Sequence, residues 1–361
     1  MTESRLDQLR KRIDVLDEQI QTLLNERARC AQQVAEAKRA EDAGTTVFYR
    51  PEREAEVLRR VRERNAGPLS GDEMTRLFRE IMSACLALEQ PLMVAYLGPE
   101  GTYTQEAALK HFGHSIQLRS LSAIDEIFRE VEAGSADFGV VPVENSSEGA
   151  INHTLDMFIR SPLKICGDVE LRIHHQLIGN ADGLDAVKSV HAHQQSLAQC
   201  REWLDANLPG VERIAVSSNA EAAAQAGKDN TIAAIASEAA AQTYGLETLA
   251  ANIEDDPNNT TRFLIIGDHP VGRSGKDKTS LMVMLHNKAG ALYSLLEPVS
   301  RHGVSMTKIE SRPSRQSKWD YVFFVDVDGH CEDENVAAAL AELESRASML
   351  KVLGSYPRCE L

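Results

Sequence analysis

Apolar residues recur along the N-terminal stretch of the chain at the spacing of an α-helix. They occupy positions 6, 9, 13, 16, 20, 23, 24, 31 and 34, and this stripe predicts one helix about 35 residues long. Two shorter helices are predicted over about 51–65 and from Ser70 to near Glu89, and Ser70-Gly-Asp-Glu73 has the pattern of a capping box. A single long helix cannot bury such a stripe by itself, so the pattern predicts a helical bundle that is completed by dimerisation.

Charged residues fall on the predicted apolar faces of these helices. Arg27 and Lys38 are separated by close to three helical turns and therefore share a face of the first helix. In the third helix Cys85 and Glu89 share a face with Phe78, which puts a carboxylate among apolar side chains. Buried charges are costly unless they are paired. The charges could form a structural ion-pair network, but two cations and an acid converging from separate helices favour a polar pocket for a small anion.

From Met93 to Gly267 short apolar runs alternate with helical segments. Strands are predicted over 93–97, 138–143, 171–178, 189–191 and 231–235. Helices are predicted to begin after 102 and after 218 and to extend over 122–133, 152–159, 192–207 and 237–244. Residues 258–267 are predicted to form a polar turn followed by a strand. This alternation predicts an α/β fold with mostly parallel strands. Small polar residues follow two of the strands, in 98–105 and 144–156, and such strand ends are where α/β proteins bind ligands.

The C-terminal part has a third pattern. After a charged linker at 276–278, strands are predicted over 279–285, 304–311, 319–327 and 349–353, with helices over 290–301 and 333–345. The order βαββαβ is that of a ferredoxin-like domain.

Charge and cysteine usage narrow the possible functions. The net charge is −15, which argues against nucleic-acid binding because phosphates require basic patches. The N-terminus lacks the basic and apolar stretches of an export signal, and no apolar run is long enough to cross a bilayer, so a cytoplasmic protein is expected. The six cysteines contain no Cys-x-x-Cys and are expected to be reduced thiols without structural zinc. His174 and His175 would point to opposite faces of a strand, so no metal site is predicted.

Residues 5–90 resemble the all-helical chorismate mutases. The resemblance rests on Arg10, Arg27, Lys38, Arg53, Glu54 and Glu89, and the segment Tyr49-Arg-Pro-Glu-Arg-Glu-Ala is its most specific part. It implies that these residues and Cys85 bind the dianion chorismate, with Arg10 reaching the site of the partner protomer, Lys38 at the ether oxygen and Glu54 at the ring hydroxyl. Such a rearrangement needs no cofactor, because positioning and charge stabilisation suffice.

Two positions depart from the mutase pattern. Glu89 stands where some relatives have Gln, and a carboxyl can donate a hydrogen bond to the ether oxygen only when protonated. We therefore expect burial to raise the pKa of Glu89 or the mutase to work better at acidic pH. Arg50 stands where some relatives have an acidic residue, which leaves the contact to the ring hydroxyl open.

Residues 93–267 resemble the prephenate dehydratases. Gly98-Pro-Glu-Gly-Thr-Tyr-Thr, Val141-Pro-Val-Glu-Asn-Ser and Asn259-Thr-Thr-Arg-Phe occur in the order found in that family. The resemblance implies two α/β lobes around a cleft, as in periplasmic solute-binding proteins. It also implies that Thr261 assists departure of the ring hydroxide, that Thr102, Asn145, Ser146 and His193 line the cleft, and that Arg262 either binds a carboxylate or fixes the motif.

The last module resembles the phenylalanine-sensing ACT domains. Gly290-Ala-Leu-Tyr-Ser-Leu-Leu and Glu310-Ser-Arg-Pro carry the resemblance, which implies a phenylalanine site formed by Gly290, Ala291, Leu292, Glu310 and Ser311 at a dimer interface. A glycine at the start of the helix would let the ligand approach the backbone. Phenylalanine would then act by selecting a low-activity arrangement.

The expectation is a multidomain α and α/β enzyme without cofactor or metal. It has a mutase bundle over 1–90, a dehydratase over 93–268 and an ACT domain over 279–357. Chorismate and prephenate are its substrates, phenylalanine is its inhibitor, and a homodimer or higher homo-oligomer is its form, with no nucleic acid or membrane as partner. Two alternatives stay open: a dehydratase whose helices only dimerise or regulate, and a non-catalytic binding protein that uses the same cleft. The charges in the helices argue against the first, and Thr261 with Arg262 argues against the second.

Overall fold

The computed structural model describes residues 4–41, 48–147, 149–285, 288–313 and 321–359. The chain divides into two compact units, one formed by Met1–Leu92 with Phe112–Gln117 and the other by Met93–His111 with Leu118–Leu361. No helix within the described ranges combines the length and the apolar character needed to cross a membrane.

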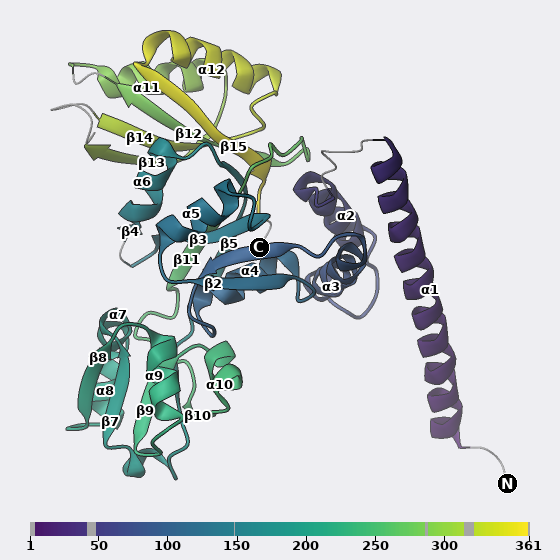
Figure 1. Cartoon of the computed structure of the whole chain (residues 1–361), viewed down its shortest axis with the longest axis vertical. Helices are drawn as coiled ribbons and strands as arrows, with labels where there is room; N and C mark the ends of the chain where they lie inside the picture. Colours follow the sequence, from purple (N-terminus) through teal and green to yellow (C-terminus); the bar gives the residue numbers. More distant parts are fainter. Residues whose placement is uncertain (1–3, 42–47, 148, 286–287, 314–320, 360–361) are drawn as a thin grey trace. The chain divides into compact units, whose positions relative to one another are not determined.

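The first unit is helical, as predicted. It contains α1 (Arg5–Glu41), α2 (Pro51–Glu63) and α3 (Gly71–Glu89). The capping box is confirmed at α3, where the Ser70 side chain accepts a hydrogen bond from the Glu73 backbone N–H. Figure 1 draws α1 as one continuous helix. Its apolar stripe is largely uncovered within the chain: Leu9 and Ile20 are more than half exposed, whereas Ala35 near its C-terminal end is buried.

The second unit begins with a sheet that carries most of the predicted dehydratase motifs. Its elements are β1 (Met93–Leu97), α4 (Tyr103–Phe112), β2 (Gln117–Leu121), α5 (Ile124–Glu132), β3 (Phe138–Asn145), β4 (Gly149–Ala150), α6 (Asn152–Arg160), β5 (Lys164–Arg172) and β11 (Thr260–Gly267). The strand order is β2-β1-β3-β11-β5, with β4 on β3. Strand β1 pairs with β3 in parallel, but β11 pairs with both β3 and β5 in the antiparallel sense.

A second sheet is inserted between β5 and β11. It contains β6 (Gln176–Gly179), a 3₁₀ turn (Leu184–Ala186), β7 (Ser189–His193), α7 (Gln194–Gln199), α8 (Arg201–Asn207), β8 (Glu212–Val216), α9 (Asn219–Ala226), β9 (Ile232–Ala236), α10 (Glu238–Tyr244) and β10 (Glu247–Ala250), in the order β10-β6-β9-β7-β8. The predicted helix caps at Ser218 and Gly245 are confirmed. The prediction of mostly parallel strands is wrong: both sheets are mixed, because the strands next to each crossover between lobes pair antiparallel.

Two further sequence predictions in this region are wrong in detail. The single strand predicted over 171–178 is two strands of different sheets, because the chain leaves the first sheet after Arg172 and enters the second at Gln176. The helix predicted over 192–207 is split at Cys200 into α7 and α8. The first difference is important for function because the break marks the passage between the two lobes.

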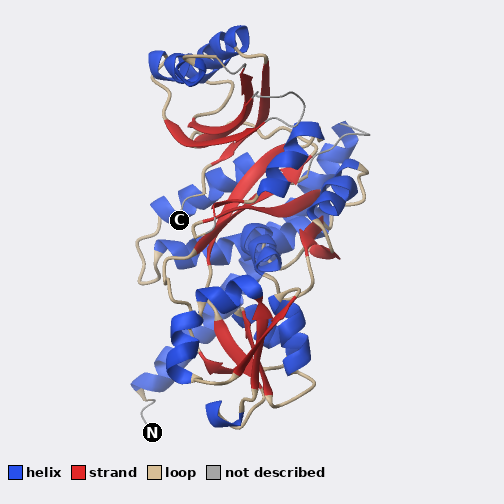
Figure 2. Ribbon diagram, turned by 90° about the vertical axis from the view of Figure 1, so that its left-hand side faces the viewer, coloured by secondary structure: helices blue, strands red, loops and turns tan. Residues whose placement is uncertain are grey.

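The C-terminal sheet has the predicted ferredoxin-like order. It contains β12 (Asp277–Leu285), α11 (Ala291–Arg301), β13 (Met306–Pro313), β14 (Tyr321–Asp328), α12 (Glu334–Arg346) and β15 (Met349–Pro357), arranged β13-β14-β12-β15. The three sheets of the second unit are drawn in red in Figure 2. One face of the C-terminal sheet packs under α11 and α12, where Leu295 and Leu343 are buried.

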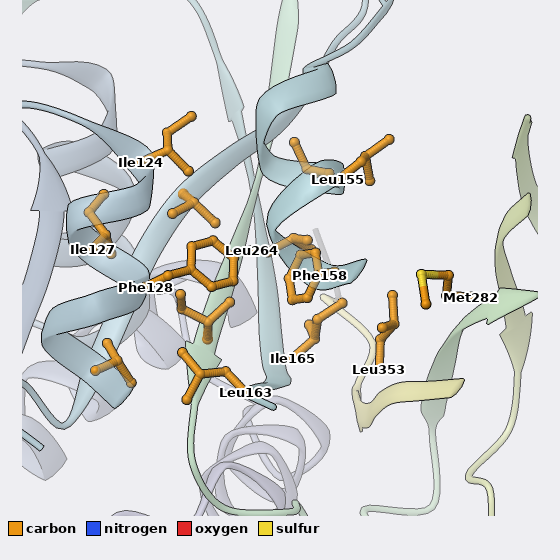
Figure 3. Packing of buried hydrophobic residues seen from close by; sticks show 14 of the residues in the cluster. Ile124, Ile127, Phe128, Leu155, Phe158, Leu163, Ile165, Leu264, Met282 and Leu353 are labelled. Carbon is orange, nitrogen blue, oxygen red and sulfur yellow. The ribbon is translucent and has the colours of Figure 1, made fainter. Parts of the chain in front are cut away.

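The other face of this sheet shares an apolar core with the first lobe. Met282 and Leu353 belong to the same buried cluster as Phe128, Phe158 and Ile165 (Figure 3). The backbones also meet closely, because a Cβ atom on Gly354 would lie 2.1 Å from the carbonyl oxygen of Ile165. The C-terminal sheet is therefore packed onto the lobe that carries the motifs. The connection runs over residues 268–276, and the linker predicted at 276–278 is wrong in its bounds, because β12 already begins at Asp277.

Candidate active sites

Asn145 and Thr261 meet where β3 ends and β11 begins. They are directly opposite each other in the antiparallel pair. The side-chain amide of Asn145 donates to Thr261 Oγ1 at 2.8 Å and to Asn259 Oδ1 at 2.9 Å. Both side chains are buried, with 7% of Asn145 and 9% of Thr261 exposed. Two motifs that are more than a hundred residues apart in the sequence thus form one polar cluster.

The hydrogen bonds of this cluster prepare Thr261 as a donor. Because Thr261 Oγ1 accepts from Asn145, its own proton can point toward a bound molecule, and accepting a bond polarises a hydroxyl. The other end of the Asn145 amide accepts from the Ser147 backbone N–H at 3.0 Å, which fixes the rotamer. Ser146 holds the strands together, since its hydroxyl accepts from the Thr260 N–H at 2.9 Å.

Thr102 lies in a loop that touches the second lobe. Its hydroxyl donates to the carbonyl of Leu97 at 2.9 Å, so it closes the loop after β1. On the second lobe, the Ser237 hydroxyl donates to the carbonyl of Gly101 at 3.1 Å. This loop is therefore the part of the first lobe that reaches α10.

Tyr103 is a residue that the sequence analysis missed. Its hydroxyl donates to the carbonyl of His174 at 2.8 Å and lies 3.0 Å from Nδ1 of His175, in the segment where the chain crosses between lobes. Burial raises the pKa of Tyr103 well above its ordinary value. The only local signal was its place in the Gly-Thr-Tyr-Thr motif.

The histidines have separate surroundings. His193 ends β7 in the second sheet and caps α7, where its ring accepts from the Gln195 N–H. His174 contacts Glu254 at 2.8 Å, and the ring of His175 contacts Gln199 at 2.9 Å. Burial lowers the pKa of His175, which favours the neutral ring.

Arg262 is directed away from the Thr261 cluster. Its guanidinium donates to Asp168 at 2.9 Å, to Asp326 at 2.7 Å and to the Tyr356 hydroxyl at 2.9 Å. Of the two sequence hypotheses, a carboxylate ligand or a residue that fixes the motif, these contacts favour the second.

In the helical unit, Arg27, Lys38 and Glu89 lie near one another, as expected from their shared faces. Burial raises the pKa of Glu89 above its ordinary value, and the charges of Lys38, Arg27 and Arg39 oppose that rise. The expected rise of the Glu89 pKa is thus confirmed in direction. Arg39 was missed; its guanidinium donates to the carbonyl of Glu89 at 2.5 Å and lies over the Phe48 ring.

Glu54 occupies a partly buried polar position between α2 and α3. Its carboxylate lies 3.6 Å from the Arg79 guanidinium, and Tyr49 also donates a hydrogen bond to it. Burial raises the pKa of Glu54 to about 7. Arg79 carried no sequence signal for this contact, because it lies on α3, whereas Tyr49 belongs to the Tyr49-Arg-Pro-Glu-Arg-Glu-Ala segment that the mutase resemblance singled out.

The remaining mutase residues other than Cys85 are less enclosed within one chain. Arg10 is mostly exposed on α1 and pairs only loosely with Asp7, at 4.0 Å. Arg53 is exposed and pairs with Glu56 at 2.5 Å. Cys85 is buried in α3. Arg50 lies just before α2 and pairs with Glu52 at 2.7 Å.

The C-terminal module holds a pocket of about 340 Å³ at the start of α11. Its lining residues are Leu285, Lys288, Gly290, Ala291, Leu292, Tyr293, Ser311, Tyr321 and Phe323. Four of the five residues expected to bind phenylalanine are among them; Glu310 is not. Gly290 has a φ of +82°, a left-handed conformation that suits glycine.

Comparison with known proteins gives each region a family. The family model for chorismate mutase type II matches residues 9–90, that for prephenate dehydratase matches 94–271, and that for the ACT domain matches 279–345. A bifunctional chorismate mutase/prephenate dehydratase from Stutzerimonas stutzeri is 58% identical over 99% of both chains. The chain belongs to this bifunctional family. Membership of the chorismate mutase/prephenate dehydratase family accounts for all three patterns found in the sequence, and both enzyme activities go with it.

Solved structures agree with the fold of the dehydratase and ACT regions. A prephenate dehydratase from Arthrobacter aurescens, in complex with L-Phe, has a TM-score of 0.69 and 34% identity, covering 74% of this chain and 90% of its own. A protein described as a quorum quenching acylase, GqqA, has a TM-score of 0.68 and 29% identity, covering 74% and 98%. The shape alone does not select a reaction. Full-length similarity places this chain with the bifunctional enzymes.

Proposed function

We propose that this protein converts chorismate to prephenate in its helical unit and prephenate to phenylpyruvate between its two lobes. The observation that carries the second step is the buried pair of Asn145 and Thr261, built from two family motifs on neighbouring strands. Arg27, Lys38 and Glu89 support the first step, because cations suit the carboxylates of chorismate and a protonated Glu89 can donate to the ether oxygen.

The dehydratase step is assigned to Thr261. In prephenate, the bond to the ring carboxylate breaks and releases carbon dioxide, its electron pair completes the aromatic ring, and the C–O bond of the ring hydroxyl breaks. The departing hydroxide takes a proton and leaves as water. Thr261 supplies or guides that proton, and Asn145 orients and polarises its hydroxyl. Thr102, Ser146 and His193 are proposed to bind the substrate from the surrounding loops.

Phenylalanine is proposed to bind the pocket at the start of α11. The pocket combines the aromatic rings of Tyr321 and Phe323 with the lysine side chain of Lys288, which suits an aromatic amino acid with a carboxylate. The related dehydratase solved with L-Phe supports this ligand. Ser311 of β13 is proposed to contact the amino acid, and a second copy of the module is proposed to complete the site and to bring in Glu310, which does not line the pocket within one chain.

A homodimer is proposed to complete the mutase site. The stripe of α1 leaves Leu6, Leu9 and Ile13 each more than half exposed, and a second copy of the helix would bury them. Arg10, whose side chain is 68% exposed, would then reach the pocket of the partner. We also propose that the protein works in the cytoplasm, where its six free cysteines would stay reduced.

The deciding experiment gives purified protein chorismate and follows prephenate and phenylpyruvate, with and without phenylalanine. Phenylpyruvate formed from chorismate and slowed by phenylalanine supports all three assignments. In a Thr261→Ala variant we expect phenylpyruvate formation to be lost while prephenate accumulates at the normal rate, since the mutase site is in the other unit. Turnover of prephenate by that variant would refute the role of Thr261. Thr243→Ala, on the exposed side of α10, serves as the matched control.

A further inference from the structure

Arg262 is the residue after Thr261 on β11, yet its side chain serves a different face of the sheet. Consecutive residues of a strand point to opposite faces. Thr261 faces Asn145, and Arg262 faces the C-terminal sheet, where it contacts Asp326 of β14 and Tyr356 of β15. Only 11% of the Arg262 side chain is exposed.

The same division appears on the neighbouring strand β3. Asn145 lies with Thr261, while the preceding residue, Glu144, contacts Lys308 of β13 at 2.5 Å. On both strands that build the polar cluster, the residue next to the cluster residue therefore contacts the C-terminal sheet: Arg262 on β11 and Glu144 on β3. Two independent ion pairs connect that sheet to the residues next to Asn145 and Thr261.

The partners of Arg262 are themselves fixed. The second oxygen of Asp326 accepts from the Ser280 hydroxyl at 2.6 Å, and Ser280 lies 2.8 Å from the Tyr356 hydroxyl. On the other side, Asp168 of β5 is shared between Arg262 and Lys278, whose ammonium lies 3.1 Å away. The two positive charges of Arg262 and Lys278 thus match the two negative charges of Asp168 and Asp326, and all four side chains are largely buried. Buried charges of this kind tolerate little movement, because losing one partner leaves another charge unpaired.

We propose that Arg262 is a positioning residue: it acts through Thr261 by fixing β11 between Asp168 of the first lobe and Asp326 of the C-terminal sheet, and it does not contact prephenate. This proposal rests on the proposed role of Thr261. It also gives the C-terminal sheet a direct part in the dehydratase geometry, because two of the three Arg262 partners belong to it. A shift of that sheet on binding phenylalanine would be transmitted through Arg262 to the strand that carries Thr261.

The two possible roles of Arg262 differ in measurable ways. A side chain that binds the substrate carboxylate raises KM when it is removed, whereas one that only orders a catalytic group lowers kcat with little change in KM. If Arg262 bound the substrate, its contribution to turnover should also not depend on Asp326 or Tyr356. The test therefore uses full-length Arg262→Lys and Asp326→Asn, with kcat and KM for prephenate measured at several phenylalanine concentrations.

Asp328→Asn is the matched control. Asp328 lies two residues from Asp326 on the same strand, but its ion pair is with Arg358 and not with Arg262. We expect Arg262→Lys and Asp326→Asn to lower kcat roughly 10-fold or more, with KM for prephenate within about twofold and with weakened inhibition by phenylalanine, while Asp328→Asn behaves as wild type. Wild-type turnover in the same assay tests the proposed function separately.

Two results would overturn the proposal. One is a KM raised about 10-fold or more by Arg262→Lys with kcat retained, which would make Arg262 a substrate ligand. The other is an Asp326→Asn variant with wild-type kcat, KM and phenylalanine response, which would mean that the C-terminal contact does not position the strand. If Arg262→Lys fails to fold, as judged by its circular dichroism melting curve, the Asp326→Asn result decides alone.

Discussion

The Glu54 carboxyl should make the helical unit less stable as the pH rises. Glu54 is 19% exposed beside Arg79, and burial raises its pKa from the ordinary value of 4.5 to about 7. Between these two pH values the folded unit holds a proton that the unfolded chain has released. Stability therefore falls as pH rises through this window and stays low above it.

The size of the effect follows from the shift. One pKa unit corresponds to about 1.4 kcal/mol, so ionised Glu54 costs the folded unit about 3 kcal/mol relative to the protonated form. The pairing with Arg79 is already contained in that pKa, since its charge opposes the rise. Glu54→Gln keeps the shape and removes the ionisation. It should gain about 3 kcal/mol over wild type at pH 8 and almost nothing at pH 4.

Hydrogen exchange of α2 peptides measures this difference in the full-length protein. After correction for the intrinsic rate, wild-type protection should fall by roughly 100-fold between pH 4 and pH 8, and Glu54→Gln should flatten that change. Glu56→Gln is the control, because Glu56 is on the same helix, is exposed, and has its pKa lowered by Arg53. A pH dependence in Glu54→Gln equal to that of wild type would refute the argument. Mutase activity should fall in this variant if Glu54 also binds the ring hydroxyl.

Two further predictions concern the mutase. Burial raises the pKa of Glu89, and only the protonated carboxyl can donate a hydrogen bond to the ether oxygen, so wild-type kcat for chorismate should decline as the pH rises through that raised pKa. In a chorismate-consumption assay, Glu89→Gln should show a flat profile between pH 5 and pH 9. The same decline in the variant as in wild type would contradict the assignment. Leu16→Asp places a charge in the exposed apolar stripe of α1 and should give a monomer in sedimentation experiments. Its mutase activity should fall at least about 10-fold while prephenate turnover persists, whereas the control Gln19→Asp on the same helix should behave as wild type. A Leu16→Asp variant that remains dimeric and active would refute the proposed role of the stripe in dimerisation.

The sequence was informative wherever a local pattern decides the structure. The period of α1, the cap at Ser70 and the ferredoxin-like order near the C-terminus all follow from spacing and turn chemistry. Family motifs supplied the residues of the polar cluster. The contact between Asn145 and Thr261 required the structure, because no local signal shows that β11 pairs with β3.

The failures have physical causes. The alternation in the run 171–178 continues where the chain passes between the lobes. Leu171 and Leu177 on the two sides of the break are both buried, and so is His175, whose ring is hydrogen-bonded. Periodicity therefore does not reveal that the chain changes sheets. The edge strands β2 and β8 were missed because they are short and only half-buried. The partners of Arg262 were missed because Asp168 and Asp326 are distant in sequence and carry no motif.

The insertion of the second sheet between β5 and β11 sets an order for biosynthesis. β3 is made long before β11, because Asn145 and Thr261 are separated by 116 residues. At about 5–20 residues per second, a ribosome needs roughly 6 to 23 s to span that gap. Meanwhile the edge of β3 that β11 will cover has no strand partner, a state prone to wrong pairing. The inserted lobe, continuous from β6 to β10, can fold first, and no nascent chain that ends before β11 can assemble the Asn145–Thr261 pair.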